Sequence, residues 1–300
     1  MIKQPENIYS LVCFGEILWD YSGGRPIPGS GPLQVAYHLA KLGQPPALLS
    51  RVGIDPEGEK LFQFMEACQI PTEYVQVDYH LPTGQSMTGA QEPRAGQADI
   101  LMPAAWDHIE WEEAFEPLIK KAHYLVFSSL IARSETSRNT LMRLREMAPA
   151  RVLDLRLQAP YYNRKNLETL LCGLSLLQLS LPELELITGW FSDYKNETDR
   201  IRILQDRFGI PRILVSMGPQ GSLLNAEGRI YSERRFPLLA ANGSAEAALA
   251  AFLVNWMQGG KAAESLQYSC ALGALVAASH SPCPTYEMGE IDRMLHRPSD

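Results

Sequence analysis

The stretch PLQVAYHLAKLGQPPALLSRV (residues 32–52) indicates the fold class most directly. Its first half places Val35 and Leu39 on one helical face and stops at Gly43, a residue that suits the left-handed end of a helix. Residues 47–52 then form a short apolar run of the length expected for a buried strand. Because a helix followed by a buried strand is the unit of a parallel sheet covered by helices, this stretch predicts an α/β fold.

The same alternation continues along the chain. Further strands are predicted at residues 11–18, 123–128, 151–155, 174–179 and 212–216. Two stretches break it: a glycine-rich one near residues 20–31 and one with strand-like spacing at residues 83–103. We expect these two insertions to form a small β lid on a single domain that spans residues 1–300, because no low-complexity linker separates two halves.

Composition narrows the possible partners of the chain. Of its 300 residues, 46% are hydrophobic and 20% charged, and 27 basic against 34 acidic residues give a net charge of -7. Without a basic excess, nucleic acid is not expected as a partner. Five scattered cysteines without a C-x-x-C pair favour a reducing cytoplasm. The first ten residues lack a secretory core and no apolar run is long enough to span a bilayer, so no membrane association is expected.

The segment NGSAEAALAAFL (residues 242–253) carries the clearest sign of chemistry. Small residues lead into a strongly helical run, and backbone N–H groups at such a helix start can hold an anion. Glu246, in the first turn, would then be placed as a general base. The alternative is that Glu246 only complements the helix dipole while Asn242 or Ser244 caps the helix.

An ordered series of segments resembles the PfkB family of carbohydrate kinases, most closely its fructokinase-like members. The segments are FGEILWD (residues 14–20), GSGPLQVAYHLAKLG (29–43), RVGIDPEGEKL (51–61), PTG (82–84), AWDHI (105–109), LDLRLQAPYY (153–162), LSLPELELI (179–187), SMGPQG (216–221) and the segment 242–253. The resemblance implies a ribokinase-like three-layer αβα sandwich with a mainly parallel sheet and a small β lid. It also implies transfer of a phosphoryl group from ATP, with Mg²⁺, to a sugar hydroxyl.

In the family, the motif D-T-x-G-A-G-D supplies the catalytic aspartate and the glycine N–H groups that hold the phosphoryl group. Here the resemblance places Glu246 at the catalytic position. It assigns the anion hole to Gly243, Ser244 and Ala245, and it places Ala240 and Ala241 where the motif begins. Glutamate moves the carboxylate by about 1 Å, a displacement that can reduce the rate roughly a hundredfold.

The resemblance also assigns the binding residues. Sugar contacts fall on Asp20, Gly29, Ser30 and Gln34, and nucleotide contacts on Ser180, Ser216, Gly218, Gly221 and Cys270. The family's N-x-x-E motif, which organises Mg²⁺ through water, reads SLPE here and keeps only Glu183. Each has a structural alternative: Asp20 as a cap or ion pair, the glycines as turn residues, and Glu183 as a helix-start carboxylate. Arg151 and Arg156 bracket Asp154 and are expected to pack or pair rather than act in catalysis.

These departures leave three hypotheses. The favoured one is a family member with little or no phosphotransfer that still binds a sugar or nucleotide. The alternative is an active ATP-dependent kinase for a fructose-like sugar, with Glu246 as base. Altered chemistry on another acceptor or donor ranks last. Since the lid often forms a dimer contact in this family, a homodimer through the lid is also expected.

Overall fold

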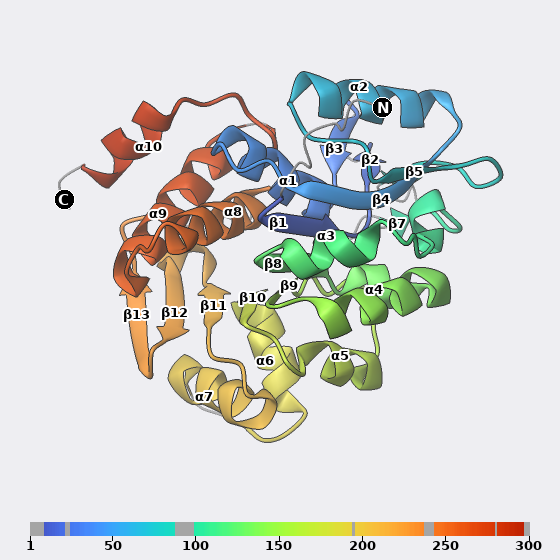
Figure 1. Ribbon diagram of the computed structural model, residues 1–300. Helices are drawn as coiled ribbons and strands as arrows, with labels where there is room; N and C mark the ends of the chain where they lie inside the picture. The colour runs from blue at the N-terminus through green and yellow to red at the C-terminus, as the bar shows by residue number, and fades with distance from the viewer. Residues whose placement is uncertain are drawn as a thin grey trace.

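A nine-stranded sheet forms the centre of the protein (Figure 1). The computed structural model describes residues 9–21, 25–87, 99–193, 196–236, 243–279 and 281–296. The strand order is β13-β12-β11-β10-β9-β8-β1-β4-β5, and every neighbouring pair from β11 to β5 is parallel, whereas β12 and β13 are antiparallel. The strands are β1 (Leu11–Phe14), β4 (Ala47–Gly53), β5 (Val75–Asp78), β8 (Tyr124–Ser128), β9 (Arg151–Asp154), β10 (Leu176–Ser180), β11 (Ile213–Ser216), β12 (Ser222–Ala226) and β13 (Arg229–Glu233).

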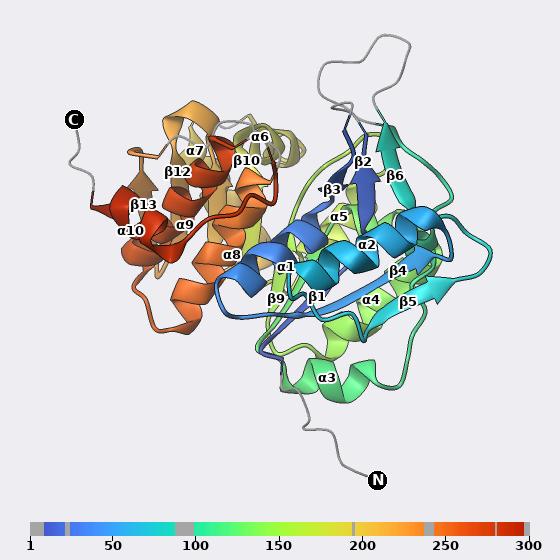
Figure 2. The same cartoon turned by 90° about the horizontal axis from the view of Figure 1, so that it is seen from above.

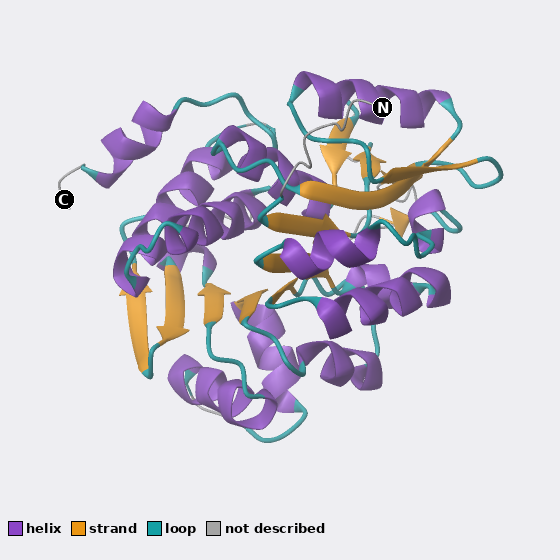
Figure 3. Ribbon diagram, viewed as in Figure 1, coloured by secondary structure: helices purple, strands orange, loops and turns teal. Residues whose placement is uncertain are grey.

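Helices cover both faces of this sheet, as Figure 3 shows. One face carries α1 (Gly31–Lys41), α2 (Pro56–Ala67), α8 (Ser244–Met257), α9 (Ala262–Ala277) and α10 (Met288–Leu295). The other carries α3 (Phe115–Lys121), α4 (Glu135–Met147), α5 (Arg164–Leu171), α6 (Leu181–Gly189) and α7 (Glu197–Phe208). Short 3₁₀ turns are η1 (Ala105–His108), η2 (Leu130–Arg133) and η3 (Gly218–Gln220). The predicted three-layer sandwich with a mainly parallel sheet is confirmed.

Two apolar cores follow from the alternation of side chains along each strand. In β1, Leu11 and Cys13 belong to the core under α1 and α8, whereas Val12 and Phe14 belong to the core on the opposite face. All four side chains are almost completely buried. Strands buried on both faces read as continuous apolar runs, which is why the sequence predicts them as parallel strands.

The predicted first strand, residues 11–18, is wrong as a single element. It divides into β1 in the main sheet and β2 (Leu18–Asp20) in a second sheet. Gly15 separates them with φ +151°, and a Cβ there would lie 2.7 Å from Cγ of Pro32. The chain therefore leaves the main sheet at a position where only glycine fits, although both halves are apolar.

The second sheet corresponds to the predicted lid and has the order β3-β2-β6-β7. Its other strands are β3 (Ile27–Gly29), β6 (Gly84–Met87) and β7 (Asp99–Ile100). Figure 2 shows β2, β3 and β6 grouped beside the main sheet. Residues 22–24 and 88–98 of the predicted lid lie outside the described residues. No described helix combines the length and apolar character that crossing a membrane requires.

Candidate active site

A cavity of about 880 Å³ opens where the main sheet meets the lid. Its walls come from the carboxyl ends of β9, β10 and β11, from the starts of α6 and α8, and from the lid strands. Loops at the carboxyl ends of parallel strands are where open α/β sheets bind ligands. The predicted site residues that line it are Asp20, Gly29, Ser30, Ser180, Glu183, Ser216, Gly218, Gly243, Ser244, Ala245 and Glu246.

The start of α8 forms one wall of the cavity. Gly243 precedes the helix with φ +86°, and a Cβ there would lie 2.5 Å from Cα of Pro282, so glycine is required. Ser244 and Ala245 follow in the first turn, where backbone N–H groups have no acceptor within the helix. This helix start is compatible with the anion-binding role that the sequence predicts for these residues. Ala240, Ala241 and Asn242, the other motif positions, lie outside the described residues.

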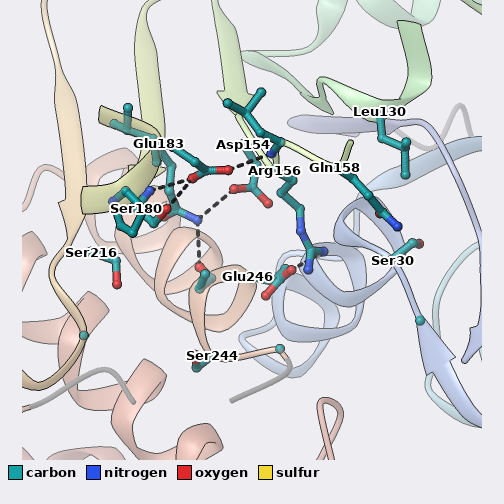
Figure 4. Close-up of a pocket in the computed structure, with 18 of the residues that line it drawn as sticks. Ser30, Leu130, Asp154, Arg156, Gln158, Ser180, Glu183, Ser216, Ser244 and Glu246 are labelled. Carbon is teal, nitrogen blue, oxygen red and sulfur yellow. Dashed lines mark hydrogen bonds and ion pairs between the residues drawn. The ribbon is translucent and has the colours of Figure 1, made fainter. Parts of the chain in front are cut away.

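The carboxylate of Glu246 forms an ion pair with the guanidinium of Arg156. The Glu246 side chain is 2% exposed and that of Arg156 is 35% exposed. Figure 4 shows Arg156 pointing from the end of β9 toward Glu246, with Asp154 on one side and Ser30 on the other. Arg156 does pair, as expected, but with the predicted catalytic residue, about ninety positions away in the chain, and inside the cavity.

The backbone around Arg156 is held tightly in an unusual conformation. Arg156 has φ +40°, in the left-handed region that side chains other than glycine rarely adopt. The hydroxyl of Ser129 donates to the carbonyls of Leu155 and Arg156, and Leu157 N donates to Oε1 of Glu183 at 2.7 Å. On the other side, a Cβ on Gly31 would lie 3.3 Å from Nη1 of Arg156. The surroundings therefore fix the direction of the Arg156 side chain.

Several carboxylates surround the guanidinium. Burial opposes its charge, but the carboxylates of Glu246, Asp154 and Glu16, with a smaller contribution from Glu183, outweigh this and raise the pKa of Arg156. The acidic residues that line the cavity in the described part of the chain are Glu16, Asp20, Asp154, Glu183 and Glu246, against one basic residue, Arg156. Within the described lining, the positive charge that can attract an anionic ligand is therefore this guanidinium, and the other donors are neutral N–H and O–H groups.

Asp154 is a cavity residue to which we assign no role from the sequence. Its Oδ1 accepts from Nε2 of Gln178 at 3.3 Å, and the same nitrogen donates to the carbonyl of Ala245 at 2.9 Å. Its Oδ2 is buried with no hydrogen-bond partner among the described residues. Burial, followed by the charge of Glu246, raises the pKa of Asp154 to about 8. Asp154 and Gln178 are polar residues in otherwise apolar strands, and this sequence signal could have pointed to the site.

Glu183 uses both carboxylate oxygens at the start of α6. Oε2 accepts from the N–H and the hydroxyl of Ser180, each at 2.7 Å, and Oε1 accepts from Leu157. This is a capping box, the structural alternative for this residue. No group of three or more His, Cys, Asp or Glu side chains in the described ranges could hold a metal ion. A Mg²⁺ ion carried by ATP takes most of its ligands from phosphate and water, so Glu183 fits only an indirect, water-mediated role.

Only some of the residues predicted to contact the sugar line the cavity. In the lid, Oδ1 of Asp20 accepts from the hydroxyl of Ser86 at 3.0 Å. The hydroxyl of Ser30 donates to the carbonyl of Glu16 at 2.6 Å. Gln34 does not line the cavity: its side chain is fully buried in α1, and its amide nitrogen donates to the carbonyl of Pro28 at 3.1 Å. The placement of Gln34 among the cavity contacts is therefore not supported.

Likewise, only some of the residues predicted to contact the nucleotide line the cavity. Ser180, Ser216 and Gly218 line the cavity, and Figure 4 shows Ser180 and Ser216 on the side opposite Ser30. Gly221 instead packs closely against the backbone of β13, because a Cβ there would lie 2.0 Å from the carbonyl oxygen of Glu233. Cys270 is fully buried in the core on α9, where burial raises the pKa of its thiol to about 12. Neither Gly221 nor Cys270 reaches the cavity.

Comparisons with known proteins agree with this architecture. The chain is 24% identical over 276 residues to a 5-dehydro-2-deoxygluconokinase of Clostridium beijerinckii, covering 84% of this chain and 79% of that protein. It is 24% identical over 237 residues to the probable fructokinase-7 of Arabidopsis thaliana, covering 70% and 67%.

Two solved structures have the same fold. A fructokinase from Vibrio cholerae, in fructose, ADP and potassium ion bound form, superposes with a TM-score of 0.82 at 17% identity and covers 98% of this chain and 100% of that one. A putative ribokinase II from E. coli, in complex with ATP and Mg²⁺, has a TM-score of 0.81 at 18% identity, with 97% and 100% covered. The sequence profile described as pfkB family carbohydrate kinase matches residues 28–287. With its ribokinase-like sandwich and this match over most of its length, the chain belongs to the pfkB family of carbohydrate kinases.

Proposed function

We propose that this pfkB-family protein binds a sugar in the cavity and transfers phosphate to it slowly or not at all. The observation that carries the proposal is the ion pair between Glu246 and Arg156. A general base must lie within hydrogen-bonding reach of the proton that it removes. Here Oε1 of Glu246 faces Nη1 of Arg156, so the guanidinium competes with a sugar hydroxyl for this carboxylate.

The residue beside Glu246 reduces transfer further. Ala245 stands where the family motif has a glycine, and its Cβ lies at the turn where phosphate would approach. Ala245 keeps its N–H, but a Cβ that holds phosphate away from this donor would have the effect of losing it, and losing one N–H donor to a developing charge lowers the rate by about 10² to 10³. The longer Glu246 side chain adds a misplacement that can cost roughly a hundredfold. The two effects together would remove most of the catalysis.

The second candidate is an active ATP-dependent sugar kinase, with Glu246 as its base. It is favoured by the continuity of the cavity, in which Asp20, the start of α8 and the turn at Ser216 and Gly218 face one space. Relatives named 5-dehydro-2-deoxygluconokinase and fructokinase suggest which sugars to try.

The test is a coupled ADP-release assay with ATP and Mg²⁺ on fructose, 5-dehydro-2-deoxygluconate and a wider sugar panel. We expect turnover far below the range of about 1–100 s⁻¹ that is usual for kinases, together with thermal stabilisation by at least one sugar. The double variant Ala245→Gly/Glu246→Asp should raise turnover at least tenfold. Glu264→Asp, the same change in the exposed first turn of α9, is the matched control and should leave it unchanged. Parent turnover within the usual range would establish the second candidate instead.

For the assembly, we propose a homodimer through the lid. Met87, Leu101 and Met102 are large apolar side chains at or beside the lid strands and are 46%, 46% and 55% exposed. Grouped exposed apolar side chains commonly mark an interface. The lack of paired cysteines is consistent with a reducing cytoplasm as its compartment.

Sedimentation at micromolar concentration tests the dimer. We expect a dimer that Met102→Lys dissociates, because a charge would be buried in the contact. Met288→Lys, at a similarly exposed methionine on α10, should leave the dimer intact. Sedimentation of the parent as a monomer alone would contradict this assembly.

A further inference from the structure

The guanidinium of Arg156 has one edge engaged and one edge available. Nη1 faces Glu246, whereas Nε and Nη2 make no hydrogen bond with the residues that the structure describes. The side chain is 35% exposed and lines the cavity. Nε and Nη2 form the side-on fork of arginine, whose two parallel N–H groups match the two oxygens of a carboxylate.

This fork is held in place before any ligand arrives. The left-handed backbone of Arg156 and its contacts with Ser129 and, through Leu157, with Glu183 set the direction of the side chain. Gly31 leaves the room that the guanidinium needs. Strained backbone that its surroundings hold firmly is typical of a ligand site. A fixed fork also loses little conformational entropy on binding.

We propose that Arg156 is the receptor for a carboxylate group of the ligand, so that the cavity prefers a sugar acid to a neutral sugar. The proposal deepens the proposed function, because it rests on sugar binding in this cavity. Hydroxyl groups of the same ligand would find Asp20 and Ser30 on the lid side. Arg156 would thus be a specificity-determining residue.

The neighbouring acids permit a single added negative charge. Burial raises the pKa of Glu16 and raises that of Asp154 to about 8, so Asp154 carries a proton at pH 7 in most molecules. A Cβ on Gly31 would lie 3.4 Å from Oδ2 of Asp154 and 3.3 Å from Nη1 of Arg156, so the two groups lie close together against Gly31, and both residues line the cavity. A protonated Oδ2, which has no other partner in the described structure, can donate to a bound ligand.

The same groups disfavour a dianion. Asp154 faces Glu246 on α8, Glu183 on α6 and Arg156 in its own loop, and Arg156 also faces Glu16. Because the guanidinium already balances Glu246, a phosphate group with two charges would meet more repulsion than a carboxylate with one. We therefore expect a sugar acid to bind more tightly than a sugar phosphate.

Binding should also depend on pH. Above pH 8, Asp154 ionises and repels a bound carboxylate, so affinity for a sugar acid should fall from pH 6.5 to pH 9. Affinity for a neutral sugar has no such charge to lose. The pH profile therefore distinguishes carboxylate recognition from general sugar binding.

Calorimetric titration without ATP tests the proposal with gluconate, fructose and fructose 6-phosphate as probes. The parent protein should bind gluconate at least tenfold more tightly than fructose or fructose 6-phosphate at pH 6.5. Arg156→Lys keeps a positive charge beside Glu246 but offers no planar fork, and should bring the gluconate-to-fructose ratio close to one. Arg202→Lys, at an exposed arginine on α7, is the matched control and should keep the parent ratio.

Asp154→Asn provides a second variant that does not disturb the ion pair. It should keep the preference for gluconate and lose its decline between pH 6.5 and 9. Equal or tighter binding of fructose or fructose 6-phosphate by the parent, no binding of gluconate, or an unchanged ratio in Arg156→Lys would each overturn the proposal. Kinase turnover would refute the proposed low activity but not this preference, so the two failures can be told apart.

Discussion

Gly243 shows how one residue sets the geometry of the anion-binding turn. Its left-handed backbone begins α8, and Pro282 lies against the side where a Cβ would project. Gly259, which follows α8, has almost the same φ of +85°, but a Cβ there would meet nothing within 4 Å. The two glycines separate the cost of the backbone conformation from the cost of contact.

We therefore predict that Gly243→Ala destabilises the protein more than Gly259→Ala. The left-handed backbone alone costs about 1–2 kcal/mol with a Cβ. Only Gly243→Ala must also move Pro282, whose Cα would be 2.5 Å away. Urea unfolding measures both free energies, and equal losses for the two variants would show that the Pro282 contact does not restrict this turn.

The sequence could identify the retained site residues but not the central pair. Glu246 and Asp20 are placed by their motifs, and both line the cavity. Arg156 could be placed only beside Asp154, because nothing in a linear pattern joins residue 156 to residue 246. The predicted contacts of Gln34 and Cys270 are not found for a different reason. Both residues stand at positions that the family resemblance places at the site, but their side chains are buried in the core rather than in the cavity.

At the scale of elements, α6 is tied to the loop after β9 by Glu183. The same carboxylate caps the helix through Ser180 and accepts from Leu157, next to Arg156. A helix cap thus supports the loop that presents Arg156 to the cavity. This contact links the stability of α6 to the geometry of the site.

We predict that Glu183→Ala lowers the free energy of unfolding by about 1–3 kcal/mol, because it removes the cap and leaves the N–H of Leu157 without its partner. Glu183→Gln keeps one acceptor oxygen and should lose less. Glu264→Ala removes the corresponding residue of α9, where the N–H of Lys261 is close to solvent, and should have the smallest effect. Thermal denaturation of the three variants in any other order would contradict this assignment.

Most elements of the main sheet can be read from the sequence, since continuous apolar runs mark strands buried on both faces. Their ends differ by one or two residues, as in β10, predicted at 174–179 and observed at Leu176–Ser180. The division of residues 11–18 could not be read in this way. Both β1 and the start of β2 are apolar, and the break depends on the contact between Gly15 and Pro32.

At the scale of the whole molecule, His38 joins the first helix to the C-terminal segment. Its Nδ1 lies 3.1 Å from the hydroxyl of Tyr286 and its Nε2 lies 3.0 Å from the carbonyl of Pro282. With Nε2 protonated, the ring donates to Pro282 and accepts from Tyr286. Burial lowers the pKa of His38 from 6.5 to about 4, only partly offset by the bond to Pro282.

The sign of the pH effect follows from this direction. Between pH 6.5 and about 4, the unfolded chain binds a proton at His38 that the folded protein does not, so stability should fall as the pH falls. Each tenfold change in proton affinity is worth about 1.4 kcal/mol, which makes the loss on the order of 3 kcal/mol. Urea unfolding of His38→Gln across this range should show a shallower pH slope than the parent. An unchanged slope would mean that His38 does not supply the dependence.

The agreement at this scale between the predicted and the observed sandwich has a physical reason. Each apolar run and helix in the sequence carries its own periodicity, and few arrangements bury all of them. The hydrogen bond between His38 and Tyr286 joins residues that are almost the whole chain apart, and no local sequence pattern predicts it. That residues 1–300 form a single domain stays a prediction.

The pair of Arg156 and Glu246 also bears on the order in which such a site could change during evolution. Replacing Arg156 alone leaves a buried carboxylate uncompensated, and replacing Glu246 alone leaves the guanidinium among the remaining acids. Breaking a fully buried pair costs about 3–5 kcal/mol, and less where the guanidinium is partly exposed, as here. A lineage with this pair could regain an unpaired base only through a less stable intermediate or through two changes together. The ion pair would therefore act as a barrier to reversion, whatever first selected it.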